Sequence, residues 1–140
     1  MVQFRMTKIT IKQFAILAET APSDDISLNT ELDFKISGEH KIVGVNETFT
    51  FVSHGNIFLK LELFCEFLVP KTNWESLVKG ENIIFPKDFL QIIASQTVGT
   101  ARGILFCKTE NTPFAEYIIP PINITKMVIQ DVAIKLSDIL

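Results

Sequence analysis

The chain contains few side chains that could carry out chemistry. Its 140 residues include two histidines, His40 and His54, and two cysteines, Cys65 and Cys107. Nucleophilic catalysis needs a nucleophile, a base and a group that orients the base, and a three-histidine zinc site needs one histidine more. His54 lies in a predicted hairpin turn and His40 in a polar connection, so we expect both to be solvated. The sequence therefore predicts no enzyme, no metal site and no cofactor.

The remaining candidates for chemistry, which are catalytic motifs, cysteines and paired carboxylates, give no sign of an active site. The sequence lacks the HExxH, GxSxG, GxGxxG and P-loop motifs. Its two cysteines lie in apolar stretches and form neither a CxxC nor a CxxxC pair, so we expect both thiols to be buried and reduced. The carboxylates of Glu31 and Asp33, and those of Glu62 and Glu66, are expected to point outward from strands. There they would serve solubility or a docking surface.

Length and composition predict one globular domain over residues 1–140. Apolar residues make up 47% of the chain and charged residues 21%, and the net charge is −3. No basic face is available in bulk to neutralise phosphates, so we expect no nucleic-acid partner. Arg5, Lys8 and Lys12 interrupt the apolar residues near the N-terminus, and no stretch reaches the length of a membrane span. We expect a cytoplasmic protein without membrane insertion.

The first part of the chain predicts two strands and a connection. Residues 7–19 are rich in β-branched side chains, which favour a strand. Residues 21–30 are dense in turn formers and predict a connection between elements. Strict alternation then places Leu32, Phe34 and Ile36 on one face of a second strand, with charged residues on the other face.

The next two strands are predicted to form an antiparallel hairpin. Residues 46–53 and 56–69 flank His54 and Gly55, and a glycine between two strand patterns indicates a hairpin turn. In the second of these strands every odd-numbered residue is apolar, so we expect that face in the core. The opposite face consists of Phe58, Lys60, Glu62, Phe64, Glu66 and Leu68. This mixture fits either an ordinary solvated face or a surface that a partner covers at times.

A change of hydrophobic period predicts helices in the remainder. Pro86 suits a first helical turn, and the predicted long helix covers residues 89–107. Small residues fill its middle, where Gly99 and Gly103 favour close packing of another backbone or a local break. Asn123 is expected to cap a second helix with an apolar face of Ile129, Val132, Ala133, Leu136 and Leu140. The predicted fold class is α+β: a four-stranded antiparallel sheet with two helices packed on one face.

Three motifs, in order along the chain, resemble those of the SecB-type protein-export chaperones. Residues 82–86 (NIIFP) open the long helix, and the pair Arg102 and Gly103 stands near its end. Residues 63–67 (LFCEF) resemble the apolar, apolar, Cys, Glu, apolar motif of the family's fourth strand. Residues 121–123 (PIN) resemble the family's entry to the last helix. Together with the element order, these motifs identify the chain as similar to a divergent SecB-type chaperone.

The resemblance implies an assembly and a function. SecB-type proteins form homotetramers, as dimers of dimers, in which the first strand joins two subunits and the long helix lies between dimers. This implies an oligomer interface at Gly99, Arg102 and Gly103. Such proteins are ATP-independent holdases, which keep non-native polypeptides unfolded and hand them to the translocase motor SecA. The implied groove for unfolded client polypeptides is formed by Leu32, Phe34, Ile36, Trp74, Ile124, Met127 and Val128, and the implied SecA-docking residues are Phe64 and Glu66.

Two departures from the family's pattern leave alternatives open. Members of the general export route continue into an acidic tail, whereas this sequence stops at Leu140, and the connection after Gly103 is longer than usual. The chain therefore also fits a SecB-like chaperone dedicated to one client, such as an antitoxin. A further alternative is a non-catalytic oligomeric adaptor that binds one folded partner.

Overall fold

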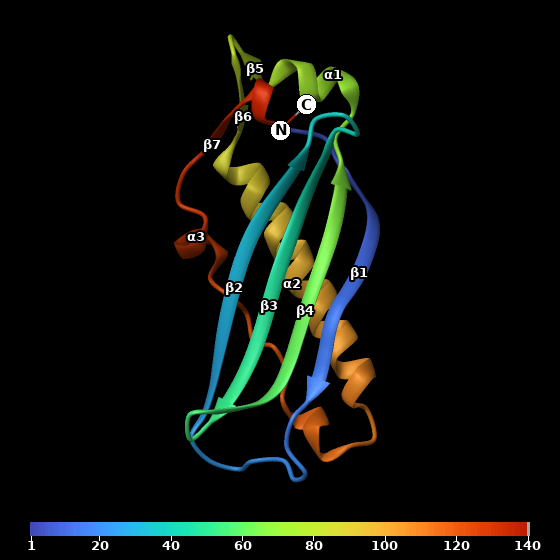
Figure 1. The fold of residues 1–140 in the computed structure, drawn as a ribbon, viewed down its shortest axis with the longest axis vertical. Helices are drawn as coiled ribbons and strands as arrows, with labels where there is room; N and C mark the ends of the chain where they lie inside the picture. Colours follow the sequence, from blue (N-terminus) through green and yellow to red (C-terminus); the bar gives the residue numbers. More distant parts are fainter. Residues whose placement is uncertain (140) are drawn as a thin grey trace.

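A four-stranded antiparallel sheet forms the centre of the protein (Figure 1). The computed structural model describes residues 1–139. Its strands are β1 (Arg5–Ile16), β2 (Ile26–Ser37), β3 (Ile42–Ser53) and β4 (Asn56–Leu68). They lie in the order β1-β4-β3-β2, so β1 and β2 are the two edges and residues 17–25 cross from one edge to the other. The predicted antiparallel sheet and the α+β class are confirmed.

Two of the strands, β2 and β3, begin earlier than their sequence patterns predict. β2 begins at Ile26, inside the predicted connection, because residues from Ile26 onward pair with β3 as far as Ser53. β3 begins at Ile42 instead of residue 46, since Ile42 pairs with both Ser37 and Leu68. Cross-strand pairing therefore overrides local turn composition at both places.

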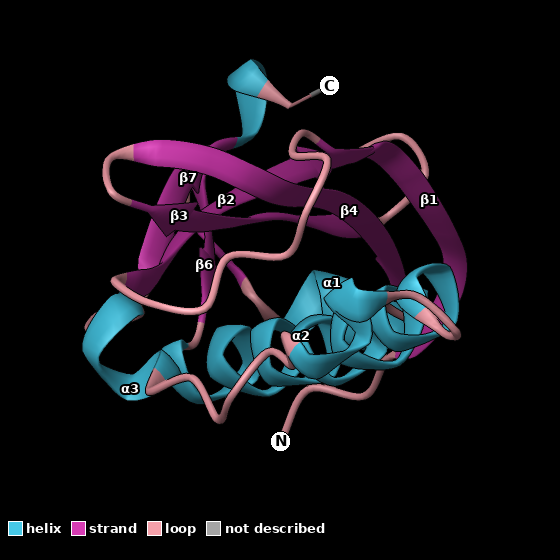
Figure 2. Ribbon diagram, turned by 90° about the horizontal axis from the view of Figure 1, so that it is seen from below, coloured by secondary structure: helices cyan, strands magenta, loops and turns pink. Residues whose placement is uncertain are grey.

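One long helix covers the core face of the sheet. This helix, α2 (Lys87–Thr109), packs against β3 and β4, and Figure 2 shows α1 (Lys71–Ser76), α2 and α3 (Ile124–Met127) in one layer on the same side of the sheet. The prediction of a long helix over residues 89–107 is confirmed. The helix runs unbroken through Gly99 and Gly103, so the alternative of a local break there is wrong.

The predicted second helix begins after Asn123 as expected, but its predicted extent is wrong. α3 has only four residues, and Val132 begins a strand, β7 (Val132–Lys135). β7 pairs with β6 (Asn82–Phe85), which also pairs with β5 (Val78–Lys79), to form a small second sheet. The alternation of Val132 and Ile134 serves this pairing, so the helical spacing of the same apolar residues was coincidental. Two short 3-10 helices, Pro113–Glu116 and Leu136–Asp138, complete the fold, and the expected helix residue Leu140 lies outside the described residues.

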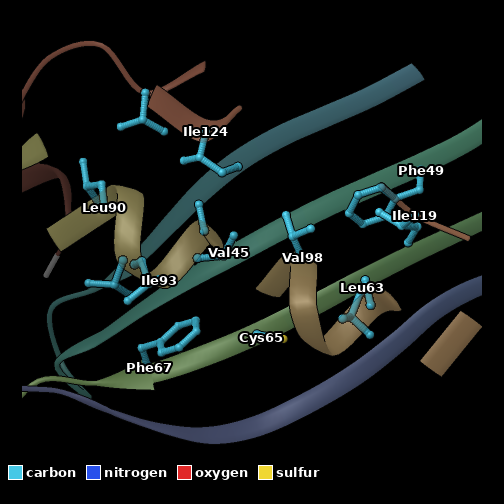
Figure 3. Packing of buried hydrophobic residues seen from close by; sticks show 14 of the residues in the cluster. Val45, Phe49, Leu63, Cys65, Phe67, Leu90, Ile93, Val98, Ile119 and Ile124 are labelled. Atoms are coloured by element: carbon cyan, nitrogen blue, oxygen red, sulfur yellow. The ribbon is translucent and has the colours of Figure 1, made fainter. Parts of the chain in front are cut away.

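The core lies between β3, β4 and α2 (Figure 3). Leu61, Leu63, Cys65 and Phe67 of β4 are buried in it, as predicted for that face. Ile57 is an exception at 45% exposure, while its neighbour Phe58 is buried at 2%. The cause is a register shift between β3 and β4. Phe51 pairs with Leu59 and Val52 with Ile57, so Phe58 is an extra residue without a partner on β3. This bulge turns Phe58 toward the core and Ile57 toward the solvent.

The two thiols have different environments. Cys65 is buried in the core, and burial raises its pKa. Cys107 is exposed near the end of α2, so the prediction that both cysteines are buried is wrong for this one. Its neighbours in the chain, Phe106 and Lys108, are exposed as well.

Candidate functional site

The apolar row on β2 lies at the edge of the core. Phe34 pairs with Val45 and Ile36 with Val43, so this row faces the same side of the sheet as the buried residues of β3. Leu32, Phe34 and Ile36 are only partly buried, because β3 is the sole strand neighbour of β2 in the described sheet. The row is therefore a half-exposed apolar margin.

A connecting segment lies along this margin. We call residues 117–128, from the end of the first 3-10 helix through α3, the strap; Figure 1 shows α3 beside β2. Ile119, Ile124 and Val128 of the strap are buried, at 0%, 5% and 5% exposure. Ile118 and Met127 point outward, at 57% and 37% exposure, and Ile129 follows at 69%. The strap thus covers the core with one side and presents apolar side chains with the other.

Side chains of α2 hold both ends of the strap. Arg102 donates from Nε to the carbonyl of Ile119 at 2.5 Å and from Nη2 to that of Pro120 at 2.9 Å. Gln91 donates to the carbonyl of Val128 at 2.8 Å. Since Arg102 already binds the backbone of its own chain, its side chain has an intrachain role. The sequence analysis placed Arg102 in an interface and did not single out Gln91 at all.

The predicted groove residues divide into three groups. Leu32, Phe34 and Ile36 are partly buried and pack against the core cluster, which contains Ile124, Val128 and also Trp74. Met127 lies on the outward side of the strap. Trp74 is buried on α1, with its ring 5.5 Å from that of Phe85 in an edge-to-face contact. Trp74 therefore belongs to the packing beneath α1 and presents no surface for binding.

The predicted docking residues lie on the outer face of the sheet. Phe64 is half-buried, with its ring against Gly44, where a Cβ would collide with it. The Lys12 ammonium lies 5.1 Å from the centroid of the Phe64 ring. Glu66 lies across from Lys8 of β1 and Gly44 of β3. Phe64 and Glu66 thus share an accessible, mixed polar and apolar face.

The opposite edge of the sheet carries a second apolar surface. Ile9, Ile11 and Ile16 of β1 are exposed at 48%, 41% and 37%. Beside them, a groove of about 480 Å³ is lined by Ile11, Gly99, Thr100, Gly103, Ile104, Cys107 and Lys108. A Cβ at Gly99 or Gly103 would meet nothing within 4 Å. Gly99 and Gly103 therefore accommodate no neighbouring backbone within the described chain.

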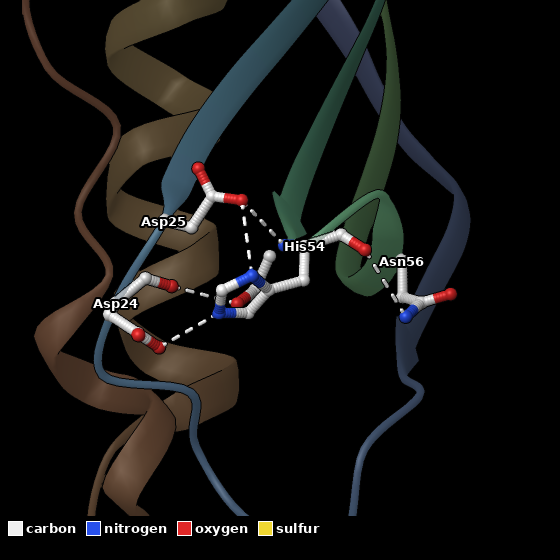
Figure 4. A network of polar contacts seen from close by, with 5 residues as sticks. Asp24, Asp25, His54 and Asn56 are labelled. Atoms are coloured by element: carbon white, nitrogen blue, oxygen red, sulfur yellow. Dashed lines mark hydrogen bonds and ion pairs between the residues drawn. The ribbon is translucent and has the colours of Figure 1, made fainter.

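The histidines lie at the surface, as expected. Figure 4 shows His54 between two carboxylates, with Nε2 3.1 Å from Asp24 and Nδ1 3.4 Å from Asp25. This contact joins the β1–β2 connection to the β3–β4 turn. His40 is exposed next to Glu39. Among residues 1–139, no group of three His, Cys, Asp or Glu side chains could hold a metal ion.

One buried carboxyl group, that of Glu47, was not predicted from the sequence. Glu47 of β3 is 0% exposed, and neither of its carboxyl oxygens has a hydrogen-bond partner. Burial raises its pKa to about 8. The burial of Glu47 could have been predicted from the alternation along β3. Glu47 occupies an inward position in the series Val43, Val45, Glu47, Phe49 and Phe51.

The fold and these surfaces define a class: an α+β protein with an apolar margin at each edge of its four-stranded sheet. No helix within the described residues is long and apolar enough to cross a membrane. No protein-family model matches the chain, and no curated protein is similar enough to count as a relative.

Proposed function

We propose that the protein is an ATP-independent holdase of SecB type, which binds non-native polypeptides along β2 and the strap. The three ordered sequence motifs and the four-stranded antiparallel sheet with a long covering helix support this proposal. The proposed site needs no catalytic group, metal or cofactor. We place the protein in the cytoplasm.

One observation carries the proposal: apolar side chains continue from the β2 margin onto the outward side of the strap. Leu32, Phe34 and Ile36 are half-buried, and Ile118, Met127 and Ile129 are exposed. β2 is also a long edge strand, and an edge strand presents unpaired backbone groups to an extended chain. Each Leu or Phe fully buried on binding contributes about 1.5–3 kcal/mol before ordering costs.

The proposed assembly is a homotetramer, built as a dimer of dimers. The exposed Ile9, Ile11 and Ile16 of β1 and the groove along Gly99 and Gly103 would be covered by other copies. Exposed apolar residues clustered on an edge strand and on an adjacent helix are typical of an interface. SecA is proposed as a partner at Phe64 and Glu66, which leaves the β2 margin free for the client.

Light scattering with an unfolded client tests the proposal. We expect a tetramer of about 63 kDa, four times the chain mass of 15.8 kDa, that captures a reduced, unfolded client and ignores its native form. The double variant Leu32→Asp with Phe34→Asp should abolish capture. The matched control is Ser27→Asp with Asn29→Asp, which adds the same charges to exposed positions of the same strand. Failure of the wild-type protein to capture unfolded chains would overturn the proposal.

A second candidate function is favoured by the burial of the strap. Ile124 and Val128 fill the space that a client would otherwise enter, at 5% exposure each. A protein with this arrangement would suit one dedicated client, such as an antitoxin, or one folded partner as an adaptor. Under the adaptor alternative, the Leu32→Asp and Phe34→Asp double variant would retain partner binding at another surface.

A further inference from the structure

Glu47 is buried on the core face of β3. It lies on β3 between Val45 and Phe49, opposite Leu32 on β2 and Leu63 on β4. Figure 3 shows Ile119 and Ile124 of the strap in the same buried cluster as Val45 and Phe49, the two residues that flank Glu47 on the core face of β3. A carboxyl group at this position is enclosed by apolar side chains on both neighbouring strands.

The surroundings of Glu47 offer nothing to stabilise a negative charge. Neither oxygen is hydrogen-bonded, and burial raises the pKa of the group to about 8. The titratable group beside it is the Cys65 thiol of β4, whose own pKa burial raises and the charge of Glu47 raises further. The core-facing residues of β2 are uncharged, as are the buried residues of α2 and of the strap. A carboxylate formed here can gain solvation only by admitting water.

The β2 side of the core is where water can most readily enter. β2 has no strand neighbour but β3 in the described sheet, and the strap is fastened by hydrogen bonds from Arg102 and Gln91. The opposite side of Glu47 is closed by β4 and then by β1. Movement of the strap away from β2 would therefore expose the carboxyl group and the Leu32 row together.

We infer that Glu47 is a proton-operated latch: protonated, it permits the strap to close over the β2 side of the core, and ionised, it favours the open strap. This inference rests on the proposed function, because it assigns a regulation to the same client site. The open state would uncover Leu32, Phe34, Ile124 and Val128 for an unfolded segment. Acid would close the site and mild alkali would open it.

The difference in the pKa of Glu47 between the closed and open states sets the direction and size of the pH effect on strap opening. In the open, hydrated state Glu47 would titrate near its ordinary value of 4.5, and in the closed state near 8. The opening equilibrium should therefore be independent of pH below about 4.5 and rise by up to about tenfold per pH unit toward pH 8, then level off. The effect should vanish when the carboxyl group is removed.

Hydrogen exchange between pH 5 and 8, corrected for the intrinsic pH dependence of exchange, tests the latch. In the wild-type protein we expect faster corrected exchange in residues 26–37 and 117–128 as the pH rises. Glu47→Gln and Glu47→Leu should give flat profiles, so that either variant suffices if the other does not fold. Glu31→Gln, an exposed carboxylate on the same sheet, is the control and should retain the wild-type profile. A flat wild-type profile, or the wild-type slope in a folded Glu47 variant, would overturn the inference.

Capture of a reduced, unfolded client over the same pH range separates this inference from the proposed function. If both hold, capture rises with pH in the wild-type protein and is independent of pH in Glu47→Leu. Capture at all pH values with a flat exchange profile would refute the latch and leave the holdase standing. A pH-dependent strap with no capture at any pH would refute the holdase and leave the latch standing.

Discussion

The two edges of the sheet differ in charge and in covering. Residues 1–18, which include β1, carry three Lys or Arg and no Asp or Glu, whereas residues 19–39, which include β2, carry six Asp or Glu and one Lys. The β1 edge is bordered by an open groove along α2, and the β2 edge is bordered by the strap. One edge is thus basic and uncovered, and the other is acidic and partly covered by the chain itself.

Because of this difference, we propose different roles for the two edges. Exposed isoleucines beside a glycine-lined groove suit a permanent contact with a rigid surface, such as a second copy of the helix. A half-buried row beside a segment held by three hydrogen bonds suits a surface that opens and closes. An acidic edge would also speed the encounter with basic segments of an unfolded chain, which is an effect on association more than on final affinity.

The largest expected effect on the β2 side is a loss of stability as the pH rises. Glu47 holds its proton in the folded state up to about pH 8 but loses it near pH 4.5 when unfolded. The free energy of unfolding should therefore fall between these two values, by as much as about 5 kcal/mol from this group. Urea unfolding at pH 5 and pH 8 measures the difference, and Glu47→Gln should remove most of it. An equal difference in the variant would assign the pH dependence to other groups.

Arg102→Ala should have the next largest effect, again on the β2 side. The change removes two hydrogen bonds from a charged donor to the strap, and each such bond contributes about 1.5–3 kcal/mol at most. Because Arg102 is partly exposed, we expect a total loss of about 2–3 kcal/mol. Chemical unfolding gives the stability, and faster hydrogen exchange confined to residues 117–128 shows that the strap is released. A variant that dissociates the assembly and leaves the strap's exchange unchanged would instead place Arg102 in an interface.

Gly103→Leu separates assembly from protomer stability on the β1 side. The helix passes through Gly103 with open space around it, so Leu should stabilise the isolated protomer by up to about 1 kcal/mol through helix propensity. The same side chain would fill the groove that another copy is proposed to occupy. We expect light scattering to show a smaller species than the wild-type protein, with thermal stability of the protomer retained. An unchanged wild-type oligomer would exclude this groove from the interface.

The smallest effect is expected at the connection between the two edge strands. His54→Gln removes the contacts with Asp24 and Asp25 that join the β1–β2 connection to the hairpin turn. All three side chains are largely exposed, so the loss should be within about 1 kcal/mol. Thermal unfolding at pH 5.5 and in high salt measures it, and the effect should shrink with salt. A loss of several kcal/mol would indicate that this turn contributes more to the fold than its exposure suggests.

Most strands of the four-stranded sheet could be predicted from the sequence, but the secondary structure near the C-terminus could not. Alternation predicted β2 and β4 because one face of each strand is buried, and Pro86 marked the start of α2. The pairing of β7 with β6 was not predictable, since it depends on contacts between residues about 50 positions apart. The reversal at Ile57 and Phe58 depends on a bulge in the register with β3, which leaves no local signature.

The candidate site was predictable in part. The row of Leu32, Phe34 and Ile36 follows from period-2 alternation and lies where that pattern indicated, on the core side of β2. The resemblance named Ile124, Met127, Val128 and Trp74, but the burial of Trp74 under α1 is a tertiary contact that no motif encodes. Arg102 was named from its motif, while its bonds to the strap depend on the path of the chain after α2.

The most direct test of client binding at the β2 edge is hydrogen exchange of the protein with and without a bound, reduced, unfolded client. We predict slower exchange in residues 26–37 and 117–129 when the client is bound, and unchanged exchange in β1 and in the α2 groove. Protection confined to β1 and α2, or equal protection by the folded client, would contradict the assignment of client binding to the β2 edge.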